Sequence, residues 1–316
     1  MLVPTSHVAC VGAGTIGGGW TAHFLARGLQ VKAYDPSPTA LERLLRQVEV
    51  AWPNLERLGI AARAGLNNLQ LHDSIDEVLS DAMFVQESAP EILNLKRAVL
   101  SEIDRLVDPS VIIGSSTSGL LLTDMTTNCL HPERIVIGHP FNPPYLVPLV
   151  EVVGGEQTSP QALEQARSFY EAMNKTVIVL DKEIPGFVAN RLQEALWREA
   201  LHMVKAGEAT AEQIDLAIEH GPGIRWATMG PFQIAHLAGG PDGIAGSMRR
   251  FGSELKDPWT RMSAPAYSED LIHQIAEQCD RIVGSRSYEI LVEERDRHIV
   301  DTLASKQASS GDQLVL

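Results

Sequence analysis

The chain has 316 residues, of which 44% are hydrophobic, enough to bury the cores of two domains. Its formal net charge of −14 argues against binding to nucleic acid or to an anionic membrane surface, because there is little basic surface to neutralise phosphates. No apolar run approaches the roughly 20 residues of a membrane helix, and Cys10, Cys129 and Cys279 show no metal-ligand spacing, so we expect a cytoplasmic protein with reduced thiols and no metal.

The first half of the chain alternates short β-branched runs with longer amphipathic segments, which is typical of βαβ units and a parallel sheet. Buried strands are predicted at residues 7–14, 29–35, 69–73, 83–88, 110–116, 134–139, 146–153 and 176–181. Helices are predicted at residues 15–28, 36–59, 74–82 and 90–107. Gly28 closes the first of these helices, and Pro53 interrupts the second.

From about Pro185 onward the pattern changes to amphipathic helices, predicted at residues 188–207, 210–221, 231–239 and 268–284. Thr210 and Gln213 form a capping box at the start of the second, and Pro231 occupies the first position of the third. We therefore predict a Rossmann-type, doubly wound α/β domain over residues 1–184. An all-helical domain should follow over residues 185–316, with a polar tail that frays from about residue 305.

A glycine-rich loop directly follows the first predicted strand and opens the first helix. Gly12, Gly14 and Gly17 have the G-x-G-x-x-G spacing: the first allows a tight turn, the second lets the backbone approach a pyrophosphate, and the third lets helix and strand pack closely. The sequence predicts a dinucleotide site formed by these glycines with Thr15 and Ile16. A tight turn without a ligand is the alternative.

Asp35 ends the second predicted strand, 18 residues beyond Gly17, where the dinucleotide fingerprint expects an acid for the ribose hydroxyls. A carboxylate there repels a 2′-phosphate, which favours NAD over NADP as the cofactor. The alternative is that Asp35 caps the following helix.

His139 follows the apolar strand at residues 134–138, and Glu151, twelve residues later, lies inside another apolar run. Ligands of open α/β sheets sit at the carboxyl ends of the strands, so His139 should lie at that edge. Histidine is suited to take a hydroxyl proton near neutral pH, and a buried acceptor would fix its tautomer. A lone carboxylate in an apolar strand is costly unless paired. The sequence therefore predicts that His139 is a general base and that Glu151 is its hydrogen-bonding partner. The alternative is that the two residues form a hydrogen-bonded pair in the core with no catalytic role.

Further motifs appear in one order along the chain: G-x-G-x-x-G, "STSG" at residues 116–119, "GHPFNP" at 138–143 and "GFVANRL" at 186–192. In this order the chain resembles the L-3-hydroxyacyl-CoA dehydrogenase superfamily over about residues 5–300. The resemblance implies NAD-dependent oxidation of a 3-hydroxyl group, with a Rossmann-type domain followed by a helical domain. It also implies a homodimer formed through the helical domain.

The resemblance implies a role for each matching polar residue. His139 would be the catalytic base and Glu151 its partner, Ser118 would hold the substrate oxygen, and Asn190 matches the asparagine of the family's "NRL" motif. Without the resemblance, Asn190 reads as an N-terminal cap of the long helix.

Three more residues match family positions that line the cofactor: Glu91, Lys96 and Asn142. A solvated helix face is the alternative for Glu91 and Lys96, and a turn before Pro143 is the alternative for Asn142.

The substrate implied by the resemblance is a small free 3-hydroxy acid. The segments "AWPNLERLG", "IRWATMGPF" and "DPWT" resemble the members of the family that oxidise L-carnitine. Pro140 replaces the phenylalanine that usually follows the histidine in acyl-CoA enzymes, and residues 41–59 carry three arginines but no lysine. Both departures count against a CoA substrate, although a 3-hydroxyacyl-CoA and L-gulonate stay open as alternatives.

A trimethylammonium group cannot donate a hydrogen bond and is best held by aromatic faces, at about 0.5–2 kcal/mol per contact. The candidate faces lie beside the catalytic motifs in sequence, and ordinary core packing is the alternative for each. They are Phe141, Tyr145, Phe187, Trp197 and Trp226.

Two readings of a different class also remain. Enzymes of the 3-hydroxyisobutyrate and 6-phosphogluconate type share the glycine loop but use a lysine in the long helix, and residues 186–197 contain none. A binding or structural protein could keep the dinucleotide fold without catalysis. The joint presence of His139, Glu151, Ser118 and Asn190 argues against that reading.

Overall fold

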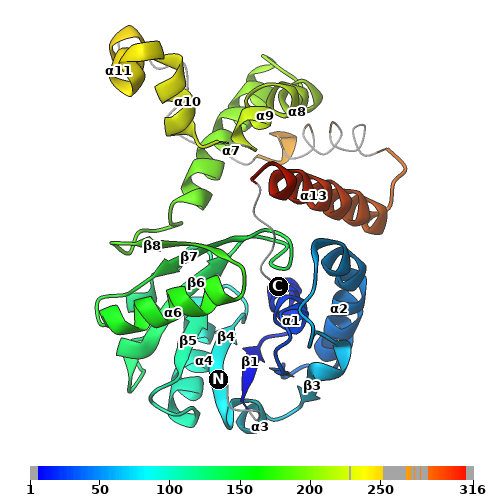
Figure 1. Cartoon of the computed structure of the whole chain (residues 1–316), viewed down its shortest axis with the longest axis vertical. Helices are drawn as coiled ribbons and strands as arrows, with labels where there is room; N and C mark the ends of the chain where they lie inside the picture. Colours follow the sequence, from blue (N-terminus) through cyan, green and yellow to red (C-terminus); the bar gives the residue numbers. More distant parts are fainter. Residues whose placement is uncertain are drawn as a thin grey trace. The chain divides into compact units, whose positions relative to one another are not determined.

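The computed structural model describes residues 6–227, 229–251, 268–271, 274, 278 and 284–310 of the chain. Its first part contains an eight-stranded sheet of order β3-β2-β1-β4-β5-β6-β7-β8 (Figure 1). The strands are β1 (His7–Val11), β2 (Val31–Tyr34), β3 (Leu69–His72), β4 (Ala82–Glu87), β5 (Ile112–Ser115), β6 (Ile135–Pro140), β7 (Leu149–Val153) and β8 (Thr176–Leu180). This sheet confirms the prediction of a Rossmann-type α/β fold.

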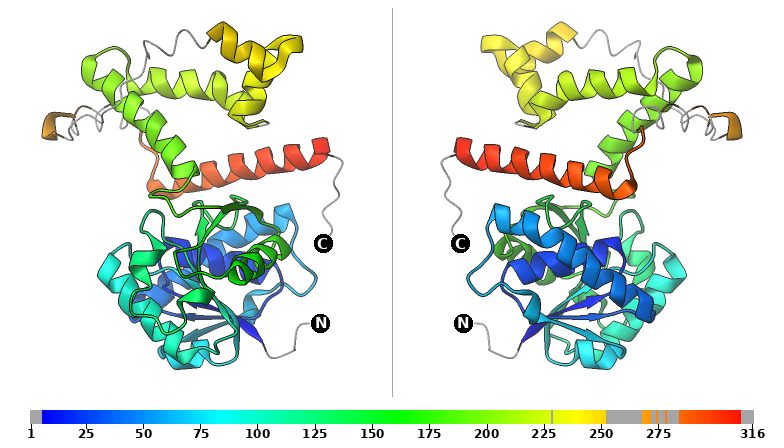
Figure 2. Two further views of the ribbon diagram at one scale, coloured as in Figure 1. Left: turned by 90° about the vertical axis from the view of Figure 1, so that its left-hand side faces the viewer. Right: turned by 90° about the vertical axis from the view of Figure 1, so that its right-hand side faces the viewer.

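Helices cover both faces of the sheet (Figure 2). One face packs against α1 (Thr15–Ala26), α2 (Pro38–Leu58) and α6 (Pro160–Ala172), whose buried side chains form one core cluster with the strands. The other face packs against α3 (Ile75–Leu79), α4 (Leu93–Leu106) and α5 (Leu122–Met125). Alternate strand residues therefore feed two separate cores, as the near-continuous apolar runs of a buried sheet require.

The sheet is parallel except between β6 and β7, which pair antiparallel. The connection between them, residues 141–148, is too short for a crossover, and parallel neighbours need a dozen or more residues. The strand β8 then pairs parallel to β7, with α6 as the crossover. The direction of β7 brings the strand that holds Glu151 back alongside the strand that holds His139.

The predicted interruption at Pro53 is absent, because α2 runs unbroken from Pro38 to Leu58. A proline inside a helix removes one backbone hydrogen bond and usually kinks or ends it. Here the apolar stripe of α2 is buried on both sides of the proline, with Val48 before it and Leu55 after it. Packing of that stripe outweighs the lost hydrogen bond.

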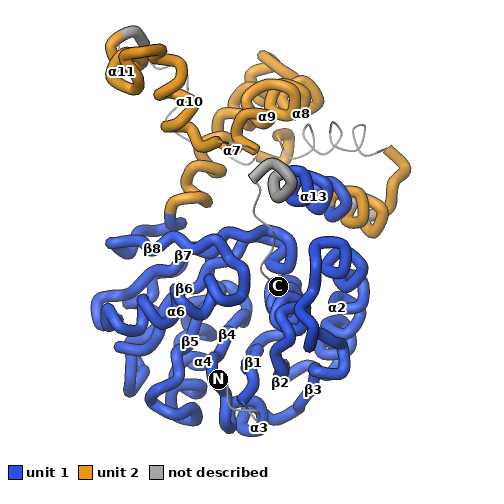
Figure 3. Tube along the Cα trace, in the orientation of Figure 1, with its two compact units in different colours: residues 1–187, 296–307, 311–316 blue, residues 188–295, 308–310 orange. Residues whose placement is uncertain are grey.

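The chain divides into two compact units, residues 1–187 with 296–307 and 311–316, and residues 188–295 with 308–310 (Figure 3). The second unit contains α7 (Ala189–Ala206), α8 (Ala211–His220), α9 (Pro222–Trp226), α10 (Pro231–Ala238) and α11 (Gly243–Phe251). Its described residues contain no strand, and the predicted capping box on Thr210 is present. The last helix, α13 (Tyr288–Ser310), includes the start of the predicted frayed tail, while residues 311–316 lie outside the described part of the chain. Much of the helix predicted at 268–284 also lies outside it.

Among the described residues, none of the helices combines the length and apolar character needed to span a bilayer.

Two glycines in adjacent strands make room for Tyr170 of α6, whose ring is fully buried. A Cβ on Gly138 would lie 1.9 Å from the Tyr170 hydroxyl oxygen, and one on Gly114 would lie 2.5 Å from it. That hydroxyl donates a hydrogen bond of 2.7 Å to the side-chain oxygen of Gln86. Burial raises the pKa of Tyr170, so the hydroxyl stays a donor. The ring of Tyr170 therefore packs directly against the backbone of Gly138, the residue before His139, and leaves no room for a larger residue there.

We predict that Gly138→Ala lowers the free energy of unfolding by ~1–3 kcal/mol, because the added methyl group overpacks the site of the Tyr170 hydroxyl. Gly65→Ala is the matched control, since its φ of 178° suits any residue and its Cβ would meet no atom within 4 Å. Urea denaturation of both variants measures the difference. Equal stability of the two would show that Tyr170 moves aside at no cost.

Candidate active site

His139 and Glu151 lie directly opposite each other in the antiparallel pair β6 and β7. The imidazole Nδ1 is 2.7 Å from the carboxylate Oε2, and their side chains are 5% and 0% exposed. An ionised carboxylate only accepts hydrogen bonds, so Nδ1 carries the shared proton and Nε2 keeps a lone pair. An imidazole in this tautomer can act as a base at the carboxyl end of β6, where ligands of such sheets bind.

Two phenylalanine rings contact the imidazole of His139. The ring centroid of Phe141 is 5.0 Å away with a tilt of 59°, and that of Phe187 is 5.2 Å away with a tilt of 53°. Phe141 is half-buried, whereas Phe187 is fully buried in the core. The structure thus brings two of the predicted substrate residues onto the histidine itself.

The glycine loop has the shape that a dinucleotide requires. A Cβ on Gly12 would lie 2.6 Å from the Ser88 carbonyl oxygen and one on Gly17 would lie 1.9 Å from that of Gly12, so internal packing demands both glycines. A Cβ on Gly14 would point into open space, where a ligand can approach the backbone. Gly14 is also the N-cap of α1 and makes no side-chain cap. The first N–H groups of α1, from exposed Thr15 and half-buried Ile16 onward, suit a phosphate.

Asp35 lies just beyond the end of β2 and orders the glycine loop from the neighbouring strand. Its Oδ2 accepts a hydrogen bond of 2.9 Å from the backbone N–H of Ala13, and its Oδ1 accepts one of 2.9 Å from that of Ser37. The N-cap of α2 is Ser37, so Asp35 is not the cap of the following helix. The carboxylate keeps further acceptor capacity for a ribose hydroxyl.

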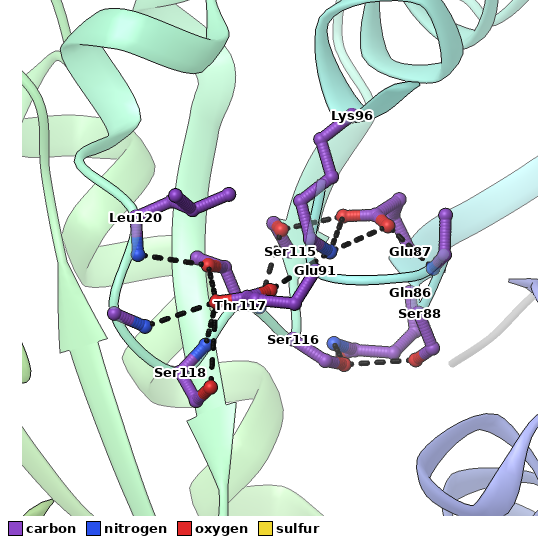
Figure 4. Close-up of polar contacts among 12 residues, drawn as sticks. Gln86, Glu87, Ser88, Glu91, Lys96, Ser115, Ser116, Thr117, Ser118 and Leu120 are labelled. Carbon is purple, nitrogen blue, oxygen red and sulfur yellow. Dashed lines mark hydrogen bonds and ion pairs between the residues drawn. The ribbon is translucent and has the colours of Figure 1, made fainter. Parts of the chain in front are cut away.

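Glu91 gathers the turn that carries Ser118 (Figure 4). Its Oε1 accepts from the Thr117 hydroxyl at 2.7 Å, the Ser118 N–H at 3.0 Å, the Gly119 N–H at 3.1 Å and the Ser118 hydroxyl at 3.3 Å. Burial raises the pKa of Glu91, but the Thr117 bond, the charge of Lys96 and the backbone N–H groups outweigh it, so the pKa lies below its ordinary value. Glu91 is therefore an ionised anchor for the turn and not merely a solvated helix residue.

Lys96 is buried in a second part of the same network, 1% exposed, and its partner Glu87 is fully buried (Figure 4). The ammonium lies 2.9 Å from Glu87 Oε1 and 3.7 Å from Glu91 Oε2, so it links the two carboxylates. The Ser115 hydroxyl and the Ala89 N–H also donate to Glu87. Sequence reasoning missed Glu87, although it ends the apolar run of β4 much as Glu151 interrupts another.

The remaining predicted residues come from the loop after β6 and from the second unit. Asn142 is exposed and precedes Pro143 through a cis peptide bond. The Tyr145 hydroxyl donates to the carboxylate of Asp296 on α13, and no contact between Tyr145 and His139 is evident among the described ring pairs. Asn190, Trp197 and Trp226 belong to the second compact unit.

Within that second unit, Asn190 lies in the first turn of α7, after the N-cap Val188. Trp197 is 50% exposed and lines a groove of about 400 Å³ between α7 and α8. Trp226 ends α9 and is 46% exposed.

Comparison with known families gives two adjoining matches. Residues 7–184 match the 3-hydroxyacyl-CoA dehydrogenase NAD-binding domain, and residues 186–274 match the C-terminal domain of the same family.

Individual relatives give the same picture. The chain is 56% identical to L-carnitine dehydrogenase of Streptomyces coelicolor over 94% of this chain and 93% of that one. A solved structure of an NAD⁺-dependent dismutase, 5-formyl-3-hydroxy-2-methylpyridine 4-carboxylic acid 5-dehydrogenase, is 30% identical with a TM-score of 0.84, covering 97% of this chain and 99% of that one. The structure of (S)-3-hydroxybutyryl-CoA dehydrogenase from Ralstonia eutropha is 29% identical with a TM-score of 0.62, covering 80% and 88%.

We predict that Lys96→Met destabilises the protein by ~3–5 kcal/mol, because it leaves the fully buried Glu87 carboxylate without its cation. Adding Glu87→Gln to that variant should recover part of the loss. Arg167→Met is the control: its ion pair with Glu164 is exposed, so its loss should leave the stability nearly unchanged. Urea denaturation measures all three, and a Lys96→Met variant as stable as Arg167→Met would contradict the pairing.

Proposed function

Because the chain belongs to the 3-hydroxyacyl-CoA dehydrogenase family and is an NAD-dependent hydroxy acid dehydrogenase, we propose that it oxidises the 3-hydroxyl of L-carnitine to give 3-dehydrocarnitine. The observation that carries the chemistry is the buried bond between His139 and Glu151 at the carboxyl end of β6. The likeness to L-carnitine dehydrogenase of S. coelicolor supports the choice of substrate.

In the proposed reaction His139 Nε2 removes the proton of the substrate hydroxyl. Glu151 holds the tautomer through Nδ1 and stabilises the imidazolium that forms. Ser118, fixed by Glu91, donates to or accepts from the same substrate oxygen. NAD, when bound, supplies the acceptor for the hydride on C3. Gly12, Gly14, Gly17 and Asp35 would hold it.

A free acid suits this chain better than an acyl-CoA thioester. The protein carries a net charge of −14, and α2 contains no lysine that could meet the phosphates of CoA. The cation of carnitine would be attracted by the same negative charge. L-gulonate and 3-hydroxyacyl-CoA remain the competing substrates of the same base.

Phe141 supplies an aromatic face for the trimethylammonium group in this proposal. It is half-buried, and its ring lies beside the imidazole of His139. An aromatic face can hold a cation that donates no hydrogen bond, as a quaternary ammonium requires.

We also propose that the protein is a cytoplasmic homodimer whose NAD-binding domain ends near residue 184, followed by a helical domain that forms the dimer. Exposed apolar side chains in the second unit support the pairing, because a dimer interface would remove them from water. They include Leu192, Ile224, Phe232, Leu237 and Met248, all more than half exposed.

The substrate is tested by NADH absorbance with purified protein and NAD⁺ at alkaline pH. We expect turnover on L-carnitine and none on D-carnitine, L-gulonate or 3-hydroxybutyryl-CoA. Turnover only on the CoA thioester or the sugar acid would keep the base and discard the carnitine assignment. No turnover on any of the four compounds, with NAD⁺ still bound, would count against both the base and the carnitine assignment.

The base is tested by His139→Ala, which should lower kcat by about 10²–10⁴-fold, the range typical of a lost general base. NADH binding, followed by fluorescence, should stay unchanged. His131→Ala is the control, since His131 also lies near a carboxylate, 3.3 Å from Glu133, but on the surface. Normal turnover by His139→Ala would sink the assignment.

A further inference from the structure

The hydrogen bond to Glu151 fixes one nitrogen of His139 but not the plane of its ring. An imidazole held at Nδ1 alone can still swing about that bond, and the lone pair of Nε2 swings with it. Turnover is sensitive to such movement, because a misplacement of about 1 Å can cost 10²-fold in rate. Something besides Glu151 must therefore define where Nε2 points.

Phe187 is placed to do this. Its ring is 0% exposed, and its centroid lies 5.2 Å from that of the imidazole at a tilt of 53°, within the range of aromatic pairs. It belongs to the same core cluster as Ile137 and Val153, the residues paired across β6 and β7 two positions before His139 and two after Glu151. The Phe187 ring thus packs against the imidazole of His139 and is itself part of the buried core.

The backbone at Phe187 is strained in a way that glycine would relieve. Its φ is +52°, directly after Gly186 at +70°, and a bulky residue in this region is a genuine outlier. Such strain persists only where the surrounding structure over-determines it, and it clusters at functional sites. A glycine at this position would relieve the strain, but it would have no ring to pack against His139.

The segment that leads to Phe187 is also anchored. The Glu183 carboxylate accepts from the N–H of Thr123 at 3.0 Å and from its hydroxyl at 2.6 Å, at the start of α5. The Phe187 N–H then donates to the Ile184 carbonyl oxygen at 3.2 Å, which closes a turn. These hydrogen bonds attach residues 183–187 to the first unit and so fix the position of the Phe187 ring.

We infer that Phe187 is a positioning residue that holds the imidazole of His139 at the angle from which Nε2 meets the substrate hydroxyl. It acts through His139 and makes no contact with substrate, since its side chain is fully buried. The inference rests on the proposed function only in taking His139 as the base. It holds whichever hydroxy acid is the substrate.

The test compares Phe187→Leu with Phe24→Leu. Phe24 is also 0% exposed, but it packs on Trp20 and Phe169, away from His139. Phe187→Leu should lower kcat by about 10–100-fold with the KM for NAD⁺ unchanged, because the base is misaimed while the cofactor site is intact. Phe24→Leu should keep kcat within about twofold at a similar loss of stability.

A spectroscopic readout separates positioning from general loss of structure. In protein labelled with ¹⁵N-histidine, the Nδ1 proton shared with Glu151 should give a downfield resonance that broadens or shifts in Phe187→Leu and not in Phe24→Leu. An unchanged resonance, or equal kcat losses in the two variants, would overturn the proposal. Phe187→Met, which keeps more of the volume, replaces Phe187→Leu if that variant does not fold.

The resonance needs no substrate, so the two proposals fail separately. A wild-type protein that is silent on L-carnitine but shows the expected change in Phe187→Leu would contradict only the substrate assignment.

Discussion

The antiparallel pairing of β6 with β7 is the constraint on which the site depends. It sets His139 opposite Glu151 and buries both, so that one bond of 2.7 Å gives the buried carboxylate a partner and fixes the tautomer of the imidazole. A slip of one residue in this register would send the glutamate to the other face of the sheet. Gly138 and Tyr170 hold the strand next to that bond, and the two phenylalanine rings enclose the imidazole.

A second buried carboxylate organises the other half of the site. Glu87 binds Lys96, Lys96 approaches Glu91, and Glu91 collects the N–H groups of the Ser118 turn. Because β5 and β6 are neighbours in register, this turn and His139 lie at the same edge of the sheet. Both ends of the proposed hydroxyl-binding site thus rest on charges removed from water, which are costly to disturb.

Much of the fold and of the candidate site could be predicted from the sequence, because the sequence patterns that indicate them are local. The glycine spacing, the acid after β2, the capping box on Thr210 and the change from alternating to helical pattern each depend on a few adjacent residues. The direction of β7 was also within reach, since residues 141–148 are too few for a crossover. Packing between elements was not: the unbroken α2 at Pro53 and the strained Phe187 depend on neighbours in other elements. The pairing of Glu87 with Lys96, nine residues later, depends on how α4 packs against β4.

The most direct test of the central claim is a crystal structure of the protein with NADH and L-carnitine, a pair that cannot react. In that complex we expect the C3 hydroxyl at about 2.6–3.2 Å from His139 Nε2, with Nδ1 still bound to Glu151. A C3 hydroxyl bound to another titratable side chain, with His139 turned away from it, would rule out His139 as the base.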